Sequence, residues 1–369
     1  MRLETFAMER MQSTWENQVA ANLSESGVHP MTTRELLGGS SEAVLLDEPL
    51  AYTQSNGTIA LRERIAAMYP GATTDRIQVT NGGSEANFVS LWSLVERDDE
   101  IVMMTPNYMQ AWGLVRGFGG RVREWNLTLA DGRWQADLDA LDALVTPKTK
   151  AILICAPNNP TGARFDRAVL ERIAAAADRT GAWILSDEIY RGAERDGQES
   201  PSIWGMSDRV IVTSGLSKAY ALPGLRIGWI AASAEFVART WAYHDYTTIA
   251  PGAASDLLAR MALEPDRRAR IIARTRKVIN DNYPVLEAWL TSQGCFEWAA
   301  PDAGAICYVK YDLPIASLPL VERLRDEESV LVVPGAHFGM EGYLRIGFGN
   351  DRPTLDEGLA RMARLIARL

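Results

Sequence analysis

The stretch from residue 76 to residue 231 alternates apolar runs with segments of helical periodicity, and this alternation constrains the fold more than any other feature. The apolar runs, which predict strands buried on both faces, cover residues 76–80, 101–105, 121–127, 151–156, 183–186, 210–213 and 226–231. Helices are predicted between them over residues 84–95, 108–118 and 165–179. The pattern therefore predicts an α/β fold with a mostly parallel sheet covered by helices on both sides. Ligands of such sheets bind at the carboxyl ends of the strands, so the residues that follow the runs are the first candidates for a site.

Both ends of the chain differ from this central pattern. Before it, a helical pattern up to about residue 22 is followed by a Ser/Gly/Pro loop, and short helices are predicted over residues 32–37 and 59–68. After it come an arginine-rich helical region over residues 253–290, strands at 305–309, 330–333 and 343–348, and a final helix. This different pattern of helices and short strands predicts a smaller α+β domain.

Composition argues against several classes of function. A formal charge of −9 and a pI near 5.1 argue against nucleic acid as a partner. No stretch reaches about 18 uninterrupted apolar residues, so neither a transmembrane helix nor a membrane partner is expected. Charges interrupt the N-terminal segment, which does not resemble a secretory signal. The three cysteines form no C-x-x-C pair, which favours a reducing, cytoplasmic location, and no metal site is expected.

Lys218 is the leading catalytic candidate because of the residues around it. It follows an apolar run and lies in the string SGLSKAYALPGLRIGW. Ser217 places a hydroxyl beside the amine, and Arg226, just after a Pro-Gly turn, offers a bidentate fork for an anion. A lone lysine is usually exposed on the surface. These neighbours instead suit an amine that forms a Schiff base beside a phosphate.

Three further motifs also follow predicted strands. The turn NGGSEAN opens a helix at Gly83 and Ser84, where glycine backbone and free N–H groups can approach an anion. The turn PNNPTG presents Asn159, and Asp187 ends the strand WILS. A carboxylate at that depth is costly unless it is paired. The first two motifs also have plain structural interpretations, as a helix N-cap and as a Pro/Gly turn.

Together these motifs resemble the class I and II aminotransferases, pyridoxal 5'-phosphate (PLP) enzymes of fold type I that include aspartate aminotransferase. The resemblance covers nearly the whole chain. It implies a large domain at residues 45–250 with a seven-stranded type of mostly parallel sheet, and a smaller α+β domain formed by residues 1–44 and 251–369. It also implies a homodimer and two small-molecule substrates, an L-amino acid and the 2-oxo acid that receives its amino group.

The resemblance implies a role for each matching residue at the cofactor. Lys218 would form the Schiff base and then move a proton between the substrate Cα and the cofactor. Asp187, in the motif D-E-x-Y, would keep the ring nitrogen protonated, and Glu188 fits this role less well because Tyr190 stands three residues after Asp187. The other cofactor contacts would be Gly83, Ser84, Glu85, Ser217 and Arg226 at the phosphate, Tyr108 stacked on the ring, and Asn159 and Tyr190 at the 3-oxygen.

Other matches point to the substrate and to a partner subunit. Arg345, in YLRIGF, would hold the substrate α-carboxylate through its bidentate guanidinium. The backbone of Gly27 would lie beside the substrate, and His29 in the same loop is a titratable group that could move a proton there. Tyr52 would reach the cofactor phosphate of the partner subunit, although an exposed loop tyrosine is an equally simple interpretation.

A second chemistry on the same scaffold is the main alternative. The loop SGVH and the Lys218 string are also similar to the capreomycidine synthases and the PLP-dependent arginine oxidases. Glu16, after Trp15, is similar to a carboxylate that binds guanidinium in those oxidases. Their second such carboxylate lies three residues before the lysine, where this chain has Gly215. A non-catalytic binding protein on the same fold is a third interpretation, against which the intact lysine, aspartate, asparagine and arginine set argues.

Overall fold

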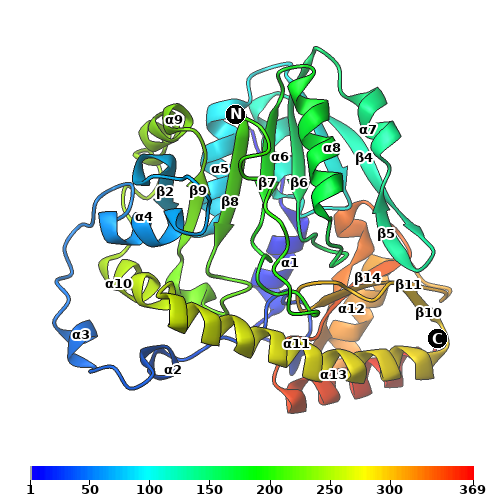
Figure 1. The fold of residues 1–369 in the computed structure, drawn as a ribbon. Coiled ribbons are helices and arrows are strands. Elements are labelled where there is room, and N and C mark those ends of the chain that lie inside the picture. Colours follow the sequence, from blue (N-terminus) through cyan, green and yellow to red (C-terminus); the bar gives the residue numbers. More distant parts are fainter. Residues whose placement is uncertain (1) are drawn as a thin grey trace.

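The computed structural model describes residues 2–369 and is built around an eight-stranded sheet (Figure 1). Its strands are β2 (Ile77–Thr80), β3 (Glu100–Thr105), β4 (Arg121–Ala130), β5 (Arg133–Ala136), β6 (Thr149–Cys155), β7 (Trp183–Asp187), β8 (Val210–Gly215) and β9 (Gly228–Ala231). Their spatial order is β2-β9-β8-β7-β6-β3-β4-β5. The pairs from β8 through β4 are parallel, whereas β9 pairs antiparallel with β8 and β2, and β5 pairs antiparallel with β4. The predicted mostly parallel sheet is therefore confirmed, with the β4–β5 hairpin as an addition.

Helices cover both faces of this sheet because alternate residues of its strands point in opposite directions. On β3, Val102 and Met104 pack into one hydrophobic core, and Ile101 and Met103 into the other. The covering helices are α4 (Ile59–Ala66), α5 (Gly83–Leu94), α6 (Gln110–Phe118), α7 (Leu138–Leu144), α8 (Arg167–Asp178) and α9 (Ala234–His244). Burial on both faces explains why the strands read as continuous apolar runs.

A smaller α+β part contains a second sheet of order β10-β11-β14-β13. Its strands are β10 (Phe296–Trp298), β11 (Ile306–Tyr311), β13 (Val333–Pro334) and β14 (Tyr343–Gly347), and its helices are α10 (Ala253–Ala262), α11 (Pro265–Gln293), α12 (Ser317–Glu328) and α13 (Arg352–Ile366). The long helix α11 runs beneath both parts of the molecule (Figure 1). The predicted domain boundaries themselves stay a prediction.

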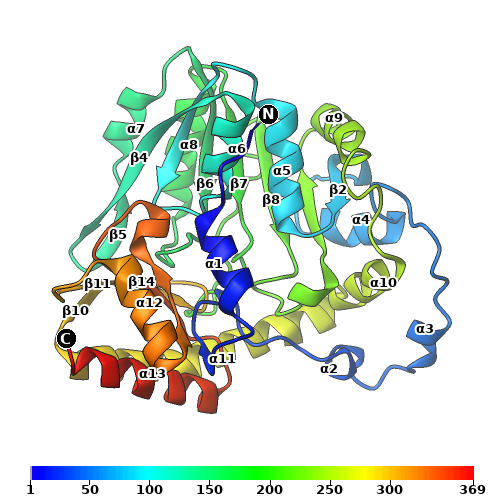
Figure 2. The same cartoon turned by 180° about the vertical axis from the view of Figure 1, so that it is seen from behind.

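The start of the chain joins this smaller part and also reaches the large sheet (Figure 2). Its elements are α1 (Ala7–Trp15), β1 (Ala21–Asn22), α2 (Thr33–Leu37) and α3 (Ala43–Leu46). Strand β1 pairs in parallel with β12 (Val330–Leu331). The helix predicted up to residue 22 is therefore too long, because its last residues form a strand. The next predicted helix is confirmed, and Thr32 and Glu35 form a capping box at its start.

The helical region predicted over residues 253–290 is two helices, and Pro265 begins the second of them. The hairpin of β4 and β5 was not predicted, although its turn carries the hairpin-forming pair Asp131-Gly132. Within the described part of the chain, no helix is both long and apolar enough to cross a bilayer.

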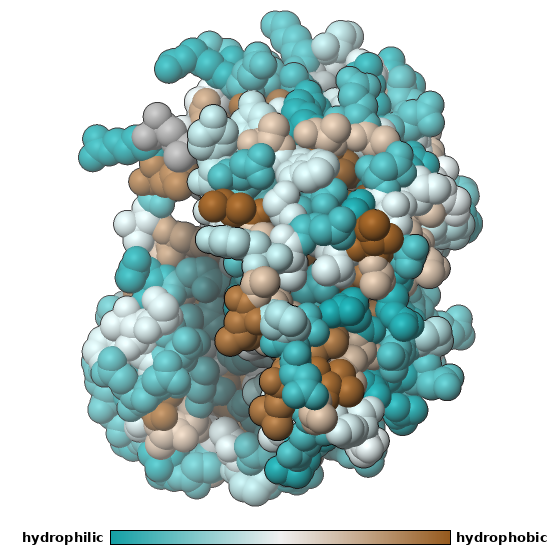
Figure 3. Space-filling view, turned by 90° about the vertical axis from the view of Figure 1, so that its left-hand side faces the viewer, coloured by the Kyte–Doolittle hydropathy of each residue, from teal (hydrophilic) through white to brown (hydrophobic). Residues whose placement is uncertain are grey.

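Large hydrophobic side chains are exposed on the side of the molecule that carries α3, the link from α3 to α4 and the link from α9 to α10 (Figures 1 and 3). Tyr52 and Leu50 are each 89% exposed, Tyr246 is 83% exposed and Leu46 is 79% exposed. Figure 3 shows several separate hydrophobic patches on this side. An isolated exposed leucine needs no explanation, but a group of exposed hydrophobic residues marks a surface suited to contact.

Candidate active site

A cavity of about 320 Å³ brings together residues from the N-terminal segment, the carboxyl ends of the central strands and β14. Eleven of the predicted site residues line it: Glu16, Gly83, Ser84, Tyr108, Asn159, Asp187, Tyr190, Ser217, Lys218, Arg226 and Arg345. These residues are far apart in the sequence. Their convergence at strand ends is the arrangement expected for a ligand site in an α/β sheet.

The N-terminus of α5 and the Arg226 guanidinium form a cradle that fits a phosphate. Gly82 precedes the helix with φ of +91°, and a Cβ atom there would collide with the Arg226 guanidinium. Gly83, Ser84 and Ser217 line the same end of the cavity. Free N–H groups of a first helical turn, a hydroxyl and a guanidinium together suit a phosphate dianion. The residues present therefore fit the phosphate of PLP.

Asp187 lies at the carboxyl end of β7 and lines the cavity. Its carboxylate accepts hydrogen bonds from Asn87 Nδ2 at 2.9 Å and from the backbone N–H of Ile189 at 3.1 Å. Burial raises the pKa of the Asp187 carboxyl, and these two donors act against that rise. A carboxylate in this environment gains from a cationic partner, which the protonated pyridine nitrogen of PLP would supply. Asn87 was not predicted, although it stands four residues after Gly83 and hence on the same face of α5.

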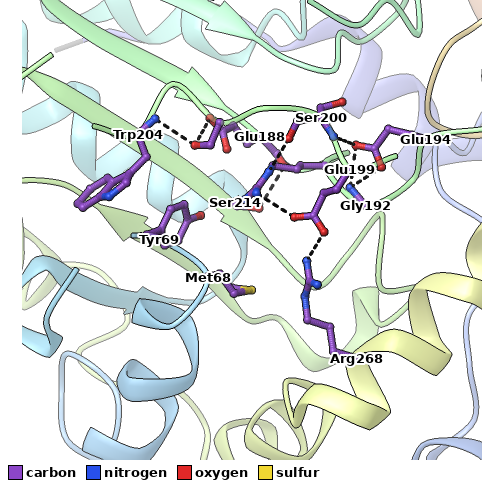
Figure 4. Close-up of polar contacts among 12 residues, drawn as sticks. Met68, Tyr69, Glu188, Gly192, Glu194, Glu199, Ser200, Trp204, Ser214 and Arg268 are labelled. Atoms are coloured by element: carbon purple, nitrogen blue, oxygen red, sulfur yellow. Dashed lines mark hydrogen bonds and ion pairs between the residues drawn. The ribbon is translucent and has the colours of Figure 1, made fainter. Parts of the chain in front are cut away.

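Glu188, the neighbouring acid, points away from the cavity. Figure 4 shows its side chain beside Tyr69 and Trp204. One carboxylate oxygen accepts hydrogen bonds from Ser202 Oγ at 2.8 Å and from the backbone N–H of Ile203 at 3.1 Å, while Oε2 has no partner among residues 2–369. Burial raises the pKa of the Glu188 carboxyl to about 7. The two acids thus occupy different environments, and only Asp187 faces the cavity.

This raised pKa predicts a pH-dependent stability. Below its ordinary pKa of 4.5 the carboxyl is neutral in the folded and unfolded states, and its burial carries no ionic cost. As the pH rises from 4.5 to about 7 the unfolded state ionises first, which lowers the free energy of unfolding by about 3 kcal/mol in total. We therefore expect Glu188→Gln to raise the unfolding temperature relative to wild type, and to raise it more at pH 8 than at pH 5. Calorimetry of both proteins at the two pH values measures this difference.

Glu199→Gln is the matched control for that experiment. Glu199 pairs with Arg191 at 2.9 Å and with Arg268 at 2.8 Å (the Arg268 pair is seen in Figure 4), and these arginines lower its pKa despite the opposing effect of burial. Because a carboxyl with a lowered pKa is ionised in the folded state and largely ionised in the unfolded state at both pH values, its replacement should destabilise the protein by nearly the same amount at pH 5 and at pH 8. A Glu188→Gln effect that did not change with pH would contradict the assignment of a neutral buried carboxyl.

The tyrosines and Asn159 form the polar wall of the cavity next to Asp187. Tyr190 donates a hydrogen bond to Ser26 Oγ at 2.8 Å, and burial raises its pKa to about 12. Tyr108 donates to Glu9 Oε1 at 2.8 Å, and burial raises its pKa well above the ordinary value. Asn159 Oδ1 accepts from Arg345 Nη1 at 2.9 Å. The wall thus supplies neutral donors and acceptors on one side of the cavity.

Arg345 is a fully buried cation that opens onto the cavity. It is 1% exposed, and its Nη2 donates to the backbone carbonyl of Ser24 at 2.6 Å. Its Nε has no hydrogen-bond partner among the described residues, and burial lowers the pKa of the guanidinium. An incompletely paired buried guanidinium suits a carboxylate ligand.

Lys218 pairs with Glu25, a residue that sequence reasoning missed. Lys218 Nζ donates to Glu25 Oε1 at 2.5 Å. Burial lowers the pKa of Lys218, but Glu25 and Tyr190 together raise it, and the net shift is upward. The same pair lowers the pKa of Glu25 to about 2. Because 193 residues separate the two, no local spacing could have indicated the contact.

Two more carboxylates, Glu9 and Glu16, line the cavity from α1 and the residue after it. Burial, together with repulsion from Glu25 and Glu9, raises the pKa of Glu16. The end of the cavity formed by the N-terminal segment is thus rich in carboxylates, and Glu16, a predicted substrate-binding residue, is one of them.

Four predicted residues do not line the cavity. Glu85 turns toward α9 and the turn after it, where it accepts hydrogen bonds from His244 Nε2 at 3.2 Å and Thr248 Oγ1 at 2.9 Å. His29 places Nδ1 3.2 Å from the carbonyl of Gly349. Gly27 lies next to Lys218, which lines the cavity, since a Cβ atom at Gly27 would be 3.5 Å from Lys218 Cδ. The structure therefore does not bring the Glu85 and His29 side chains, or the exposed Tyr52, to the site of this chain.

Gly215 has no room for a side chain. It pairs with Gly228 of β9, and a Cβ atom would lie 2.8 Å from the carbonyl oxygen of Ile227 and 3.0 Å from Gly228 Cα. The missing carboxylate at this position is thus a consequence of close strand packing.

The chain is similar to known PLP enzymes over nearly its full length. The family model "Aminotransferase class I and II" matches residues 42–362. Capreomycidine synthase from Streptomyces vinaceus is 31% identical over 94% of this chain and 90% of its own, and aromatic-amino-acid aminotransferase 2 from Thermococcus litoralis is 29% identical over 87% and 85%. A crystal structure of a PLP-dependent aminotransferase from Streptococcus suis superposes with a TM-score of 0.93 at 32% identity, over 100% of this chain and 99% of the other.

These matches, together with the cavity, show that the chain belongs to the class I and II aminotransferases. It is an enzyme of the PLP-dependent, aspartate aminotransferase-like fold. The resemblance drawn from the Lys218, Asn159, Asp187 and Arg345 motifs is therefore confirmed for the family, the fold and the cofactor.

Proposed function

We propose that the enzyme transfers the α-amino group of an L-amino acid to a 2-oxo acid, with Lys218 moving the proton. The observation that carries this proposal is that Lys218, Asp187, Asn159 and Arg345 line one cavity together with the phosphate cradle. When bound, PLP supplies an electron sink for the pair of electrons left when the substrate loses its α-proton. Everything else in the reaction falls to residues of this chain.

The roles follow from charge and position. Lys218 carries a primary amine into the cavity and can act as nucleophile and as proton carrier. Asp187 would hold the cofactor ring nitrogen in its protonated form, and Arg226 with the start of α5 would hold the phosphate. Asn159 and Tyr190 would contact the 3-oxygen, with Tyr108 against the ring. Arg345 would hold the substrate α-carboxylate.

A second candidate function, chemistry on arginine, is supported by the carboxylates of Glu9 and Glu16, which line the cavity. Glu9 and Glu16 would favour a cationic side chain, as in arginine. The similarity to capreomycidine synthase points the same way. Against it, this chain has Gly215 at the position of the second carboxylate that would bind a guanidinium group, and a side chain does not fit there. A buried guanidinium without full pairing is costly. We therefore propose transamination as the main activity, with cyclase or oxidase chemistry on arginine as the alternative.

A screen of L-amino acids with the purified holoenzyme separates transamination from oxidase chemistry. Keto acid, oxygen uptake and peroxide are measured together, with and without an added 2-oxo acid. Transamination predicts sustained keto acid formation only when a 2-oxo acid is present, and no oxygen uptake. Steady turnover of arginine with oxygen uptake and no need for a 2-oxo acid would replace this proposal with the oxidase alternative.

We further propose that the enzyme is a homodimer with a cytoplasmic location. The exposed hydrophobic side that carries Leu46, Leu50, Tyr52 and Tyr246 supports a subunit contact. Arg226 is itself exposed in the single chain, so the phosphate end of the cavity could accept a residue from a partner. We propose that Tyr52 is this residue.

Hybrid dimers test the shared site. Tyr52→Ala and Lys218→Ala should each form dimers with little activity. If Tyr52 acts across the interface, one of the two sites of a mixed dimer is intact. Half of the dimers are mixed at full exchange of equal amounts, so mixing the two variants after mild dissociation should restore up to about a quarter of the wild-type activity. Analytical ultracentrifugation would check the assembly, and an active wild-type monomer would refute the proposal.

A further inference from the structure

The Glu25 carboxylate is held beside the amine of Lys218 by the backbone of its own loop. Its Oε1 accepts hydrogen bonds from the N–H groups of Ser26 at 2.9 Å and Gly27 at 3.2 Å, as well as from Lys218 Nζ. Two backbone donors on one oxygen fix the carboxylate without the lysine. The position of this negative charge therefore does not depend on Lys218.

The same loop also fixes the substrate-side arginine. Arg345 Nη2 donates to the carbonyl of Ser24, the residue before Glu25. The Glu25 side chain is 45% exposed and lines the cavity, so its charge faces the space where a substrate would lie. A fixed anion, Glu25, and a fixed cation, Arg345, thus line the same cavity. A zwitterion carries the two charges that would pair with them.

Lys218 cannot remain the permanent partner of Glu25 in a working enzyme. The lysine amine must give up its proton and bond to the cofactor, and the Glu25 carboxylate then faces the cavity without that cation. Besides Lys218, the backbone N–H of Ser26 also lowers the pKa of Glu25 and still favours the ionised form, and a carboxylate is far too weak a base to remove a proton from an ammonium group. Its chemistry is therefore to bind a cation and not to take up a proton.

We propose that Glu25 receives the α-ammonium group of the substrate amino acid while Arg345 holds its α-carboxylate. This inference rests on the proposed transamination. In the exchange of amines, the bond from Lys218 Nζ to the cofactor carbon breaks, and the bond from the substrate nitrogen to the same carbon forms. Two protons pass from the entering ammonium to the lysine nitrogen, which leaves as a neutral amine, and the third proton stays on the substrate nitrogen. Glu25 therefore faces the ammonium of the substrate before the exchange and the amine of Lys218 after it.

This role distinguishes the two substrate classes of the enzyme. An amino acid brings both charges of the zwitterion, whereas a 2-oxo acid brings only the carboxylate. Glu25 should therefore strengthen the binding of amino acids but not of 2-oxo acids, and it should favour release of the 2-oxo product once the nitrogen has left it.

Glu25→Gln tests this assignment, because the amide oxygen can still accept the two backbone hydrogen bonds. The probes are L-α-methyl amino acids, which have no α-proton to lose, and the matching carboxylic acids that lack the amino group. Three pairs cover acidic, aromatic and cationic side chains: α-methylaspartate with succinate, α-methylphenylalanine with 3-phenylpropionate, and α-methylarginine with 5-guanidinopentanoate. Their dissociation constants are measured by titrating the cofactor absorbance of the holoenzyme.

We expect Glu25→Gln to weaken the binding of the α-methyl amino acid about 10- to 100-fold and to leave the carboxylic acid within about twofold. Glu171→Gln, which removes the same charge from the exposed surface of α8, should change neither constant. Equal weakening of both probes, no weakening of either, or loss of the cofactor absorbance in the Glu25 variant would overturn the inference. If wild type transaminated no amino acid and bound none of the probes, the proposed function would itself be wrong, a result that is distinct from these three.

Discussion

We expect the Lys218→Ala variant to lose the visible absorbance of the lysine-bound cofactor and at least about 10⁴-fold in turnover, the upper range for a positioned proton carrier. The cavity offers no substitute, because Lys218 is the only lysine among the described residues that line it. Loss of the amine removes both the covalent anchor and the group that moves the proton. Absorbance spectra of protein reconstituted with PLP and rates with the best amino donor of the screen would check both effects.

Lys310→Ala is the matched control for this variant. Lys310 lies on β11, pairs with Glu297 at 3.6 Å and is 54% exposed. This variant should keep the spectrum and the rate of wild type. If the Lys218→Ala protein still formed a bond to PLP that borohydride reduces, another amine would be the anchor, and the assignment of Lys218 would have to be abandoned.

The second large effect concerns Asp187. We expect Asp187→Asn to keep the fold and to lose about 10³-fold or more in turnover, because a neutral amide does not stabilise a protonated ring nitrogen. Burial of a neutral group also costs less than burial of a charge, so the free energy of unfolding should not fall sharply. Circular dichroism and steady-state kinetics on the same preparation would separate the two properties.

Glu188→Gln is the control for that experiment, since it makes the same chemical change one residue later, at a side chain that does not line the cavity. It should retain turnover to within about tenfold. Near-normal activity of Asp187→Asn combined with a large loss in Glu188→Gln would transfer the role to Glu188.

Much of the fold could be predicted from the sequence because the central strands are buried on both faces. The runs that became β3, β6, β7 and β8 are apolar at nearly every position, and their ends carry the motifs that meet in the cavity. The prediction failed where tertiary pairing decided the outcome. Ala21 and Asn22 leave the helical pattern because they pair with β12, more than 300 residues away.

The site was predictable only where a motif identified it. Lys218, Asp187, Asn159 and Arg345 lie in strings that match a family, whereas Glu25 lies in a Ser/Gly loop and meets Lys218 only in the folded chain. Side-chain direction was also beyond the sequence. Glu85 stands one residue after Ser84 on α5, yet this single step turns its carboxylate to His244 and away from the cavity.

The close contact between Gly215 and β9 limits how this enzyme could change its specificity. A carboxylate three residues before the lysine, as in the resembled oxidases, requires a Cβ atom where the Ile227 carbonyl and Gly228 already lie. A single substitution at residue 215 would separate β8 from β9 before it offered a new charge to a substrate. A second guanidinium-binding carboxylate at residue 215 would therefore require a change of β9 first and the substitution of Gly215 second. In the reverse order, the substitution would disrupt the sheet before it could improve binding.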